Sequence, residues 1–561
     1  METFVPERPP AHKKINQTLK DLLLIGTAIC LLIVPFLGKA YSIDDPLFIW
    51  AGRHIQSNFR DFYGFSVNWY GQRAPMHEIT KNPPLTSYFI ALCLSLFGDN
   101  EYALHALFAL WAFGLMAGIY FIAKIFSPSP FIATWAACIS PVFAISSVTT
   151  MSDIMMMFWW VWAVWFWMKG ISDRRQPFLL IAALCAVACG LTKYFGIFLV
   201  PLLCLYAVLK RVPVTKWGVF MALPVAVFIG YDGLTSMRYG HGLISDAFSY
   251  SQGLDLIKSP FAANFMIGLS FLGGCMISTL VLFQPLFKKH EIFIASGLLA
   301  ALAVCLFGLN AVHAIPGFLK RPLRWDTVVQ LSVFCFIGAT ILWLCCMDIV
   351  NHRDHLSLFL YAWIFGTFIF ASFLNWTISA RSIFPLAPAA GILLDRRIRL
   401  LNNGAIKKPA LVIFMTFSIV VSYVLACADY SLANIPRKAA REIMAQYSAQ
   451  GRTIWFQGHW GWQYYLEKYG AKALDLHLQM PKPGDLILFS SCNTNVEPLP
   501  AHLANYYATL SYRPFPFASI MDGNMRAGFY SSIWGQLPYA FGPTPPVSFD
   551  IATVVNKHQG L

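Results

Sequence analysis

Long apolar runs recur along almost the whole of this 561-residue chain and leave room for little except a bundle of membrane-spanning helices. A helix needs about 20 predominantly apolar residues to cross a hydrocarbon core of ~30 Å. Runs that reach or approach this length fall near 21–40, 103–124, 131–148, 154–169, 178–193, 195–210, 217–231, 262–285, 291–309, 329–349, 356–374, 382–394 and 409–427. The sequence therefore predicts a polytopic α-helical membrane protein with about 13 transmembrane helices.

Charged residues are scarce and unevenly placed. Only 12% of the residues are charged, 57% are hydrophobic, and the formal net charge is +14. The basic residues gather in short links between apolar runs: Lys13, Lys14 and Lys20; Arg174 and Arg175; Lys210, Arg211 and Lys216; Lys288 and Lys289; Arg396, Arg397, Arg399, Lys407 and Lys408. Cytoplasmic loops of membrane proteins show this pattern, so the net charge indicates topology and no nucleic-acid partner.

One apolar run, PPLTSYFIALCLSLFG at 83–98, is short for a span, since as a helix it reaches only about 24 Å. If it crosses the membrane, Arg174 and Arg175 fall outside. We interpret it as a re-entrant or interfacial helix, because the five basic clusters named above then fall inside, although the basic segment 319–325 falls outside. The predicted domains are a cytoplasmic tail 1–20, a transmembrane domain 21–427 with a first outer loop 41–102, and a periplasmic domain 428–561.

The last 130 or so residues follow a different pattern. RTIWFQG and GDLILFS are typical of short strands, and GWQYYLEKYG between them is typical of a helix. This segment is predicted to be a small α/β domain outside the membrane.

Most of the unusual polar residues fall on the predicted outer segments. The first outer loop contains Asp44, Asp45, Glu78 and Lys81; the others are Asp153 in the link 149–153, Lys193 in GLTKYFG, and Arg238 and His241 in the loop 232–261. Each has a structural alternative: the acids can cap helices, lysines at span ends can snorkel, and a loop histidine can make an ordinary hydrogen bond. A functional role is supported by these residues as a group, because acids and cations far apart in the sequence are all predicted to lie on the same face of the membrane.

Those residue types suit one class of reaction. A carboxylate can accept the proton of an attacking hydroxyl, and cations can hold a leaving phosphate as its charge develops. Transfer of a sugar from a lipid phosphate to a hydroxyl needs both groups beside an apolar surface.

Several motifs resemble one enzyme class. The adjacent acids after the first span, KNPPLTSYFIAL, TTMSDIMMMFWW, GLTKYFGIFLVP and ARSIFPLAP occur in the order seen in polytopic glycosyltransferases of the GT-C class. The chain is most similar to the bacterial protein O-mannosyltransferase-like group, which includes the lipid A aminoarabinose transferase. The resemblance covers roughly residues 20–430 and, weakly, the tail. It implies a polyprenyl-phosphate-sugar donor and a C-terminal periplasmic domain.

The resemblance also implies roles for individual residues. Asp44 matches the base or acceptor-orienting acid, Asp45 its partner, and Asp153 an acid near the active centre. This chain has Asp-Asp where the family usually has Asp-Glu. Lys193 and Lys81 match lysines of the family motifs, and Lys193 would hold the lipid phosphate. Arg381 matches a basic residue that reaches the same phosphate, with an interfacial anchor as its alternative.

His241 matches a polar loop position of the resembled family. Glu78, Arg238 and His241 are further candidates for acceptor or sugar contacts. No metal site is predicted from spacing, although the acids could hold a divalent ion.

The predicted function is an inverting glycosyltransferase of the inner membrane that acts on a lipid, glycan or protein acceptor at the outer face. The alternatives are a transporter or flippase of lipid-linked sugars and a structural or sensory membrane protein.

Overall fold

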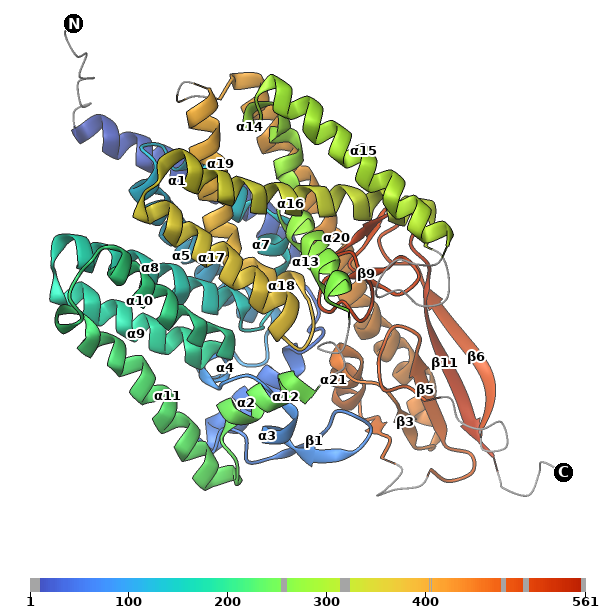
Figure 1. The fold of residues 1–561 in the computed structure, drawn as a ribbon. Coiled ribbons are helices and arrows are strands. Elements are labelled where there is room, and N and C mark those ends of the chain that lie inside the picture. The colour runs from blue at the N-terminus through green and yellow to red at the C-terminus, as the bar shows by residue number, and fades with distance from the viewer. Residues whose placement is uncertain are drawn as a thin grey trace, which may run out of the picture.

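The computed structural model describes residues 11–253, 260–312, 323–402, 404, 406–475, 481–497 and 504–555. Figure 1 shows a body of helices with a β-rich region, formed by the end of the chain, packed against one side of it. The predicted class, a polytopic helical protein with a small α/β region at its C-terminal end, is confirmed.

Among the described residues, eight helices are long and apolar enough to cross a membrane, and a bent pair makes a ninth if it is one span. The eight are α1 (Ala11–Ile33, followed by η1, Val34–Phe36), α5 (Glu101–Phe126), α8 (Asp153–Asp173), α11 (Gly218–Tyr239), α15 (Lys289–Ala311), α16 (Trp325–His352), α17 (His355–Ile369, followed by the π-helical η5, Phe370–Leu374) and α20 (Lys408–Tyr447, followed by η7, Ser448–Gln450). The bent pair consists of α13 (Phe261–Cys275) and the segment formed by η4 (Ile277–Leu282) and α14 (Phe283–Leu286), at 75° to each other.

Shorter helices account for the remaining apolar runs. They are α4 (Leu85–Phe97), α6 (Phe131–Cys138), α7 (Pro141–Ser146), α9 (Gln176–Thr192), η2 (Tyr194–Phe198), α10 (Leu199–Leu209), η3 (Val214–Lys216), α18 (Ala380–Ile383), η6 (Phe384–Leu386) and α19 (Ala387–Leu401). The expected run 131–148 is broken between α6 and α7, where Ser140 caps α7 and Pro141 begins it. Whether α4 enters the membrane or crosses it stays a prediction.

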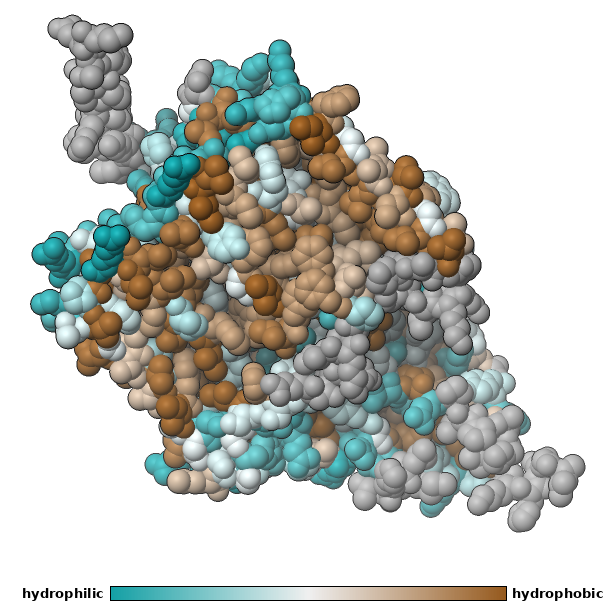
Figure 2. Space-filling view, viewed as in Figure 1, coloured by the Kyte–Doolittle hydropathy of each residue, from teal (hydrophilic) through white to brown (hydrophobic). Residues whose placement is uncertain are grey.

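The helices expose apolar side chains outward. Only 11% of the most apolar window of α15 is buried, and Phe293, Leu298 and Val304 are exposed on it. Figure 2 shows a broad apolar band over the helices, with hydrophilic residues gathered at its edges. Such a surface requires lipid, because soluble proteins rarely expose contiguous apolar area of this extent.

The lengths of the helices place the candidate site residues at one end of the helical body and the basic links at the other end. α8 begins at Asp153 and runs 21 residues, about 32 Å, before Arg174 and Arg175 follow it. α9 then returns the chain to Lys193, whose ammonium lies against Asp153. At other helix ends, Arg397 in the last turns of α19 pairs at 2.7 Å with Glu291 in the first turn of α15, which brings the basic ends of these two helices together.

The first outer loop folds into a small layer of its own. It contains α2 (Asp45–Ser57), a hairpin of β1 (Ser66–Asn68) and β2 (Arg73–Pro75), and α3 (Met76–Ile79). Gly71 in the hairpin turn has a φ of 82°, which glycine adopts without steric cost. α4 packs along α2, and α12 (Leu243–Gly253) lies beside this layer (Figure 1).

The C-terminal region is built on a five-stranded mixed sheet in the order β4-β3-β5-β11-β6. β3 (Ile454–Phe456) is parallel to β4 (Lys472–Ala473) and β5 (Leu486–Ser490), whereas β11 (Val547–Val554) is antiparallel to β5 and β6 (Ala504–Tyr512). α21 (Trp460–Lys468) connects β3 to β4. Two small ribbons pair β7 (Ala518–Ser519) with β10 (Ala540–Phe541) and β8 (Met521–Asp522) with β9 (Ala527–Gly528).

This C-terminal region is docked tightly on the first outer loop. A Cβ on Gly461 would lie 2.1 Å from the carbonyl oxygen of Tyr41, so only glycine allows α21 to approach this closely. The Tyr41 amide donates a hydrogen bond of 2.9 Å to the Tyr465 hydroxyl. Because polar groups from both regions are paired across the contact, the loop and the domain position each other.

Candidate active site

The guanidinium of Arg381 is the centre of a charged cluster at one end of the helices. Its Nη2 lies 3.6 Å from Oδ2 of Asp44, and its Nη1 lies 3.5 Å from Oδ2 of Asp153. The second oxygen of Asp153 accepts a hydrogen bond of 2.5 Å from Nζ of Lys193. Four of the residues expected from the sequence, from segments up to 337 positions apart by their numbers (381 − 44), thus form one site.

Asp44 and Asp153 both lie at the beginning of a helix, but neither side chain is used to cap that helix. Asp44 is the N-cap residue of α2, yet its carboxylate makes no capping hydrogen bond. Asp153 is the first residue of α8, behind the N-cap residue Ser152. The positive ends of both helix dipoles favour carboxylates here. The acids are therefore held at helix N-termini while their oxygens remain available to Arg381 and Lys193.

Asp45 differs sharply from its neighbour. It is fully buried, and its oxygens accept hydrogen bonds from the Ser42 amide at 2.9 Å and from the amide and hydroxyl of Thr150 at 2.8 and 2.9 Å. Burial raises the pKa of Asp45 to about 6, against the lowering effect of Lys39 and of these hydrogen bonds. Asp45 thus ties the first outer loop to the link before α8 and is poorly placed to meet a substrate.

The raised pKa of Asp45 makes the stability of the folded chain depend on pH. Because the pKa of Asp45 is about 6 in the folded chain, above the 3.8 that is ordinary for aspartate, the folded chain keeps a proton between these pH values that the unfolded chain has already lost. The contribution of Asp45 to the free energy of unfolding therefore decreases as the pH rises from about 4 to about 6.

The carboxylate of Asp44, in contrast, is accessible from outside the protein. Its side chain is 32% exposed and contacts the cluster only through Arg381. Desolvation raises the pKa of Asp44, Asp153 raises it further, and Arg381 and Lys193 oppose them. An accessible carboxylate with a raised pKa is better able to accept a proton than an ordinary surface aspartate.

Two buried polar atoms in the cluster lack hydrogen-bond partners among the described residues. They are Oδ2 of Asp153 and Nε of Arg381, while Nη1 of Arg381 donates to the sulfur of Met151 at 2.7 Å. Oδ2 of Asp153 keeps its ion pair with Nη1 of Arg381 at 3.5 Å, so the charges of the cluster are paired although its hydrogen bonding is incomplete. Lys193 is 23% exposed, which keeps one cation open to another molecule.

Lys81 lies beside this cluster with a partner of its own. Its Nζ is 2.5 Å from Oδ2 of Asp246 and 5.4 Å from the centre of the Tyr250 ring on α12. Tyr250 in turn interacts with Tyr70 and is influenced by the charge of Asp44. Lys81 is therefore on the rim of the site, and no contact joins it to Asp153 or Arg381.

The other three candidates lie elsewhere on the outer layer. Arg238 is paired with Asp61 at 3.7 Å, and the ring of His241 lies 5.5 Å from that of His77. Glu78 is exposed on α3. These residues gather where α11 ends against the first outer loop, and no contact joins them to Arg381.

Three residues that sequence reasoning passed over form a buried support behind Arg381. The Tyr530 ring lies 5.2 Å from the guanidinium, and its hydroxyl donates a hydrogen bond of 2.7 Å to Asp429 on α20. Lys39, with no exposed surface, pairs with Asp429 at 2.5 Å. A lone acid in the apolar run LACADYSL was the available signal, because ionisable groups inside spans are functional candidates by default.

Among the described residues, no three His, Cys, Asp or Glu side chains gather closely enough to hold a metal ion. The acids of the cluster are instead paired with Arg381 and Lys193.

The family profile described as dolichyl-phosphate-mannose-protein mannosyltransferase matches residues 81–230, a segment that contains Lys81, Asp153 and Lys193. A search of curated protein sequences found no match.

Two solved structures are similar to this chain. The Archaeoglobus fulgidus oligosaccharyltransferase, tethered with an acceptor peptide containing the NVT sequon, is 14% identical with a TM-score of 0.50, and the match covers 81% of this chain and 63% of that one. ArnT from Cupriavidus metallidurans, bound to undecaprenyl phosphate, is 14% identical with a TM-score of 0.43, and the match covers 84% and 92%. The match thus spans less than two thirds of the archaeal enzyme. This chain has the polytopic fold of the GT-C class of glycosyltransferases, as the resemblance of its motifs implied.

Proposed function

We propose that this protein transfers a sugar from a polyprenyl-phosphate-sugar donor to a hydroxyl or phosphate acceptor at the outer face of the inner membrane. The observation that carries the proposal is the cluster in which Arg381 bridges Asp44 and Asp153 beside Lys193. It places a reachable base next to two cations, as glycosyl transfer from a lipid phosphate requires. The family profile over 81–230 supports a lipid-phosphate-linked donor.

In the proposed reaction, Asp44 accepts the proton of the acceptor hydroxyl. The acceptor oxygen forms a bond to the anomeric carbon while the bond from that carbon to the phosphate oxygen breaks. The electron pair stays on the leaving polyprenyl phosphate, and the proton stays on Asp44 until solvent removes it. Because attack and departure occur on opposite faces, the configuration at the anomeric carbon inverts.

Lys193 and Arg381 would bind the donor phosphate and stabilise the negative charge that grows on it. Asp153 is buried between them and holds both cations in place before the donor arrives. Preorganised charges of this kind need no rearrangement during the reaction. The apolar surface shown in Figure 2 would accommodate the polyprenyl tail in the surrounding lipid.

The proposed topology puts the cytoplasmic tail 1–20 inside and the C-terminal domain 428–561 in the periplasm. The basic links around α15 and α19 support it, since they lie together at helix ends away from the Arg381 cluster.

The experiment that tests this function uses purified protein in proteoliposomes with radiolabelled polyprenyl-phosphate sugars and crude envelope lipids, glycans and proteins as acceptors. We expect label to leave the donor and appear in one acceptor class. A transporter or flippase would instead move intact labelled donor across the bilayer with no label in any acceptor, and that result would overturn the proposal.

Replacing Lys193 by methionine should weaken donor binding roughly tenfold, the effect of losing one charge-assisted contact to phosphate. The measurement is the donor KM, with kcat at saturating donor reduced less than KM rises. Lys124→Met is the matched control, because Lys124 is an exposed lysine near the end of α5 whose ammonium contacts only Thr18 among the described residues. An equal rise in KM for both variants would show that Lys193 does no more than anchor a helix.

A further inference from the structure

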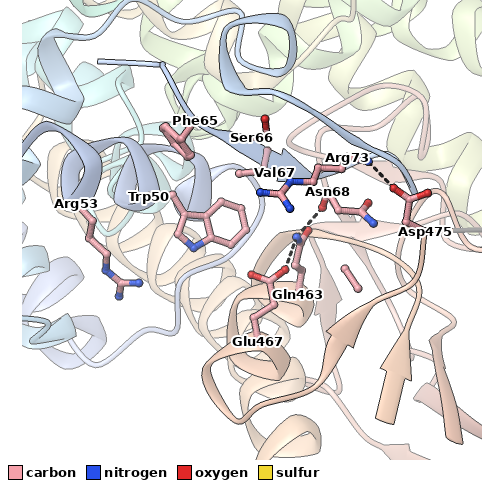
Figure 3. Close-up of a pocket in the computed structure, with 11 residues that line it drawn as sticks. Trp50, Arg53, Phe65, Ser66, Val67, Asn68, Arg73, Gln463, Glu467 and Asp475 are labelled. Carbon is pink, nitrogen blue, oxygen red and sulfur yellow. Dashed lines mark hydrogen bonds between the residues drawn. The ribbon is translucent and has the colours of Figure 1, made fainter. Parts of the chain in front are cut away.

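A cavity of about 460 Å³ lies between the first outer loop and the C-terminal region, apart from the Arg381 cluster. Figure 3 shows its three walls: Trp50 and Arg53 from α2, the β1–β2 hairpin with Arg73, and Gln463 and Glu467 from α21. Its volume is in the range of small-molecule sites.

Hydrogen bonds and an ion pair hold the lining residues in place, and the side chains of these residues still face the cavity. The Gln463 amide nitrogen donates to the Asn68 carbonyl at 2.6 Å and to Glu467 at 2.8 Å, and the Arg73 amide donates to Asp475 at 2.8 Å. Arg53 is fixed by the Tyr464 hydroxyl at 2.6 Å and by Asp99 at 2.9 Å. The site is thus built before any ligand arrives.

The chemistry of the lining favours an uncharged, hydroxyl-rich ligand. Arg53 is already paired with Asp99, and the other charged groups of the lining are Arg73, Glu467 and Asp475, so the lining has no excess of positive charge that would select an anion. Guanidinium and carboxylate groups side by side match hydroxyls, which donate and accept at once. Trp50 adds an aromatic surface that suits the C–H face of a sugar ring.

An extended peptide fits less well. Peptides that add to a sheet edge use unpaired backbone groups. Around this cavity the backbone groups are already paired. The Asn68 carbonyl accepts a hydrogen bond from α21, the Arg73 amide donates to Asp475, and the Leu474 carbonyl accepts from the Asn68 side chain at 3.0 Å.

α2 contributes residues to the cavity and begins directly after Asp44. Trp50 and Arg53 follow Asp44 by six and nine positions, so they lie about 9 and 14 Å along the helix axis from it. A di- or trisaccharide spans such a separation. Tyr70, in the turn of the same hairpin, is influenced by the charge of Asp44.

We propose that this cavity binds the glycan part of the acceptor, so that the substrate accepting the sugar at Asp44 is itself a saccharide-bearing molecule. This assignment rests on the proposed function for the reaction at Asp44, but the binding of glycan can be tested separately.

The test uses the full-length protein and the double variant Arg73→Ala/Glu467→Gln, which keeps the Arg73 backbone bond. Saturation-transfer NMR is recorded with maltotriose, mannotriose and chitotriose and with oligosaccharides released from envelopes by proteinase and mild acid. At least one saccharide should bind wild type, and the double variant should bind it roughly tenfold more weakly. Arg60→Ala, an exposed arginine of the same loop outside the cavity, should leave binding unchanged.

In transfer assays the double variant should raise the acceptor KM roughly tenfold while the donor KM stays unchanged. If wild type binds saccharide but transfers no sugar, the proposed function fails and the glycan site stands. Absence of saccharide binding to wild type, or equal binding by the double variant, would overturn the glycan assignment.

Discussion

Asp44→Asn should lower the kcat for sugar transfer by about 10²–10⁴, the contribution of a positioned general base. The change removes one charge from a side chain that is 32% exposed and touches only Arg381 within the cluster. Expression, detergent solubility and thermal unfolding should therefore stay near wild type. The measurement is the initial rate of label transfer at saturating donor and acceptor.

Asp173→Asn is the matched control, because Asp173 is an exposed aspartate at the opposite end of α8 from Asp153. It should retain transfer within about twofold, because solvent and salt screen an exposed charge so far from the cluster. Desolvation raises the pKa of Asp44, and the base must be deprotonated to act. Wild-type kcat/KM should therefore fall as the pH decreases through that raised pKa. A variant Asp44→Asn with full activity would remove Asp44 from the chemistry.

Lys39→Met should reduce the free energy of unfolding by about 3–5 kcal/mol, because it leaves the buried Asp429 carboxylate without its countercharge. Lys39 has no exposed surface, Asp429 is 2% exposed, and their charged atoms lie 2.5 Å apart. The measurement is thermal unfolding of the purified protein in detergent, in which the variant should unfold at a clearly lower temperature.

The double variant Lys39→Met/Asp429→Leu separates the ion pair from the surrounding packing. Replacing both partners by apolar residues is often close to neutral, so we expect most of the lost stability to return. Transfer should remain impaired, since Tyr530 loses the acceptor that fixes its ring over Arg381. Recovery of full activity together with stability would show that Tyr530 does not position Arg381.

Much of the architecture could be predicted from the sequence because membrane-spanning helices have a length and a composition that lipid dictates. The gathering of Asp44, Asp153 and Lys193 at one end of the helices was predicted from the order of the spans and from motif resemblance, and the structure brings them together. That this end faces outward stays a prediction. The pairing of these residues could not be read in this way, since Arg381 reaches Asp44 only through the packing of segments distant in sequence.

The sequence also could not separate Asp44 from Asp45. The two carboxylates are adjacent, and only the fold turns one toward Thr150 and the other toward Arg381. Tyr530 was similarly unpredictable, because nothing local in the tail marks a tyrosine that returns to the membrane domain. Glu78, Arg238 and His241 share the outer face with the site, and their roles in acceptor or sugar contacts stay predictions.

The anomeric configuration of the transferred sugar tests the central claim most directly. The product formed by purified protein from a donor of known configuration is analysed by NMR. Direct displacement with Asp44 as base predicts inversion at the anomeric carbon. A product with the donor's configuration would require a covalent glycosyl-enzyme or a second displacement, and it would contradict the assignment of Asp44 as the base of a single-step transfer.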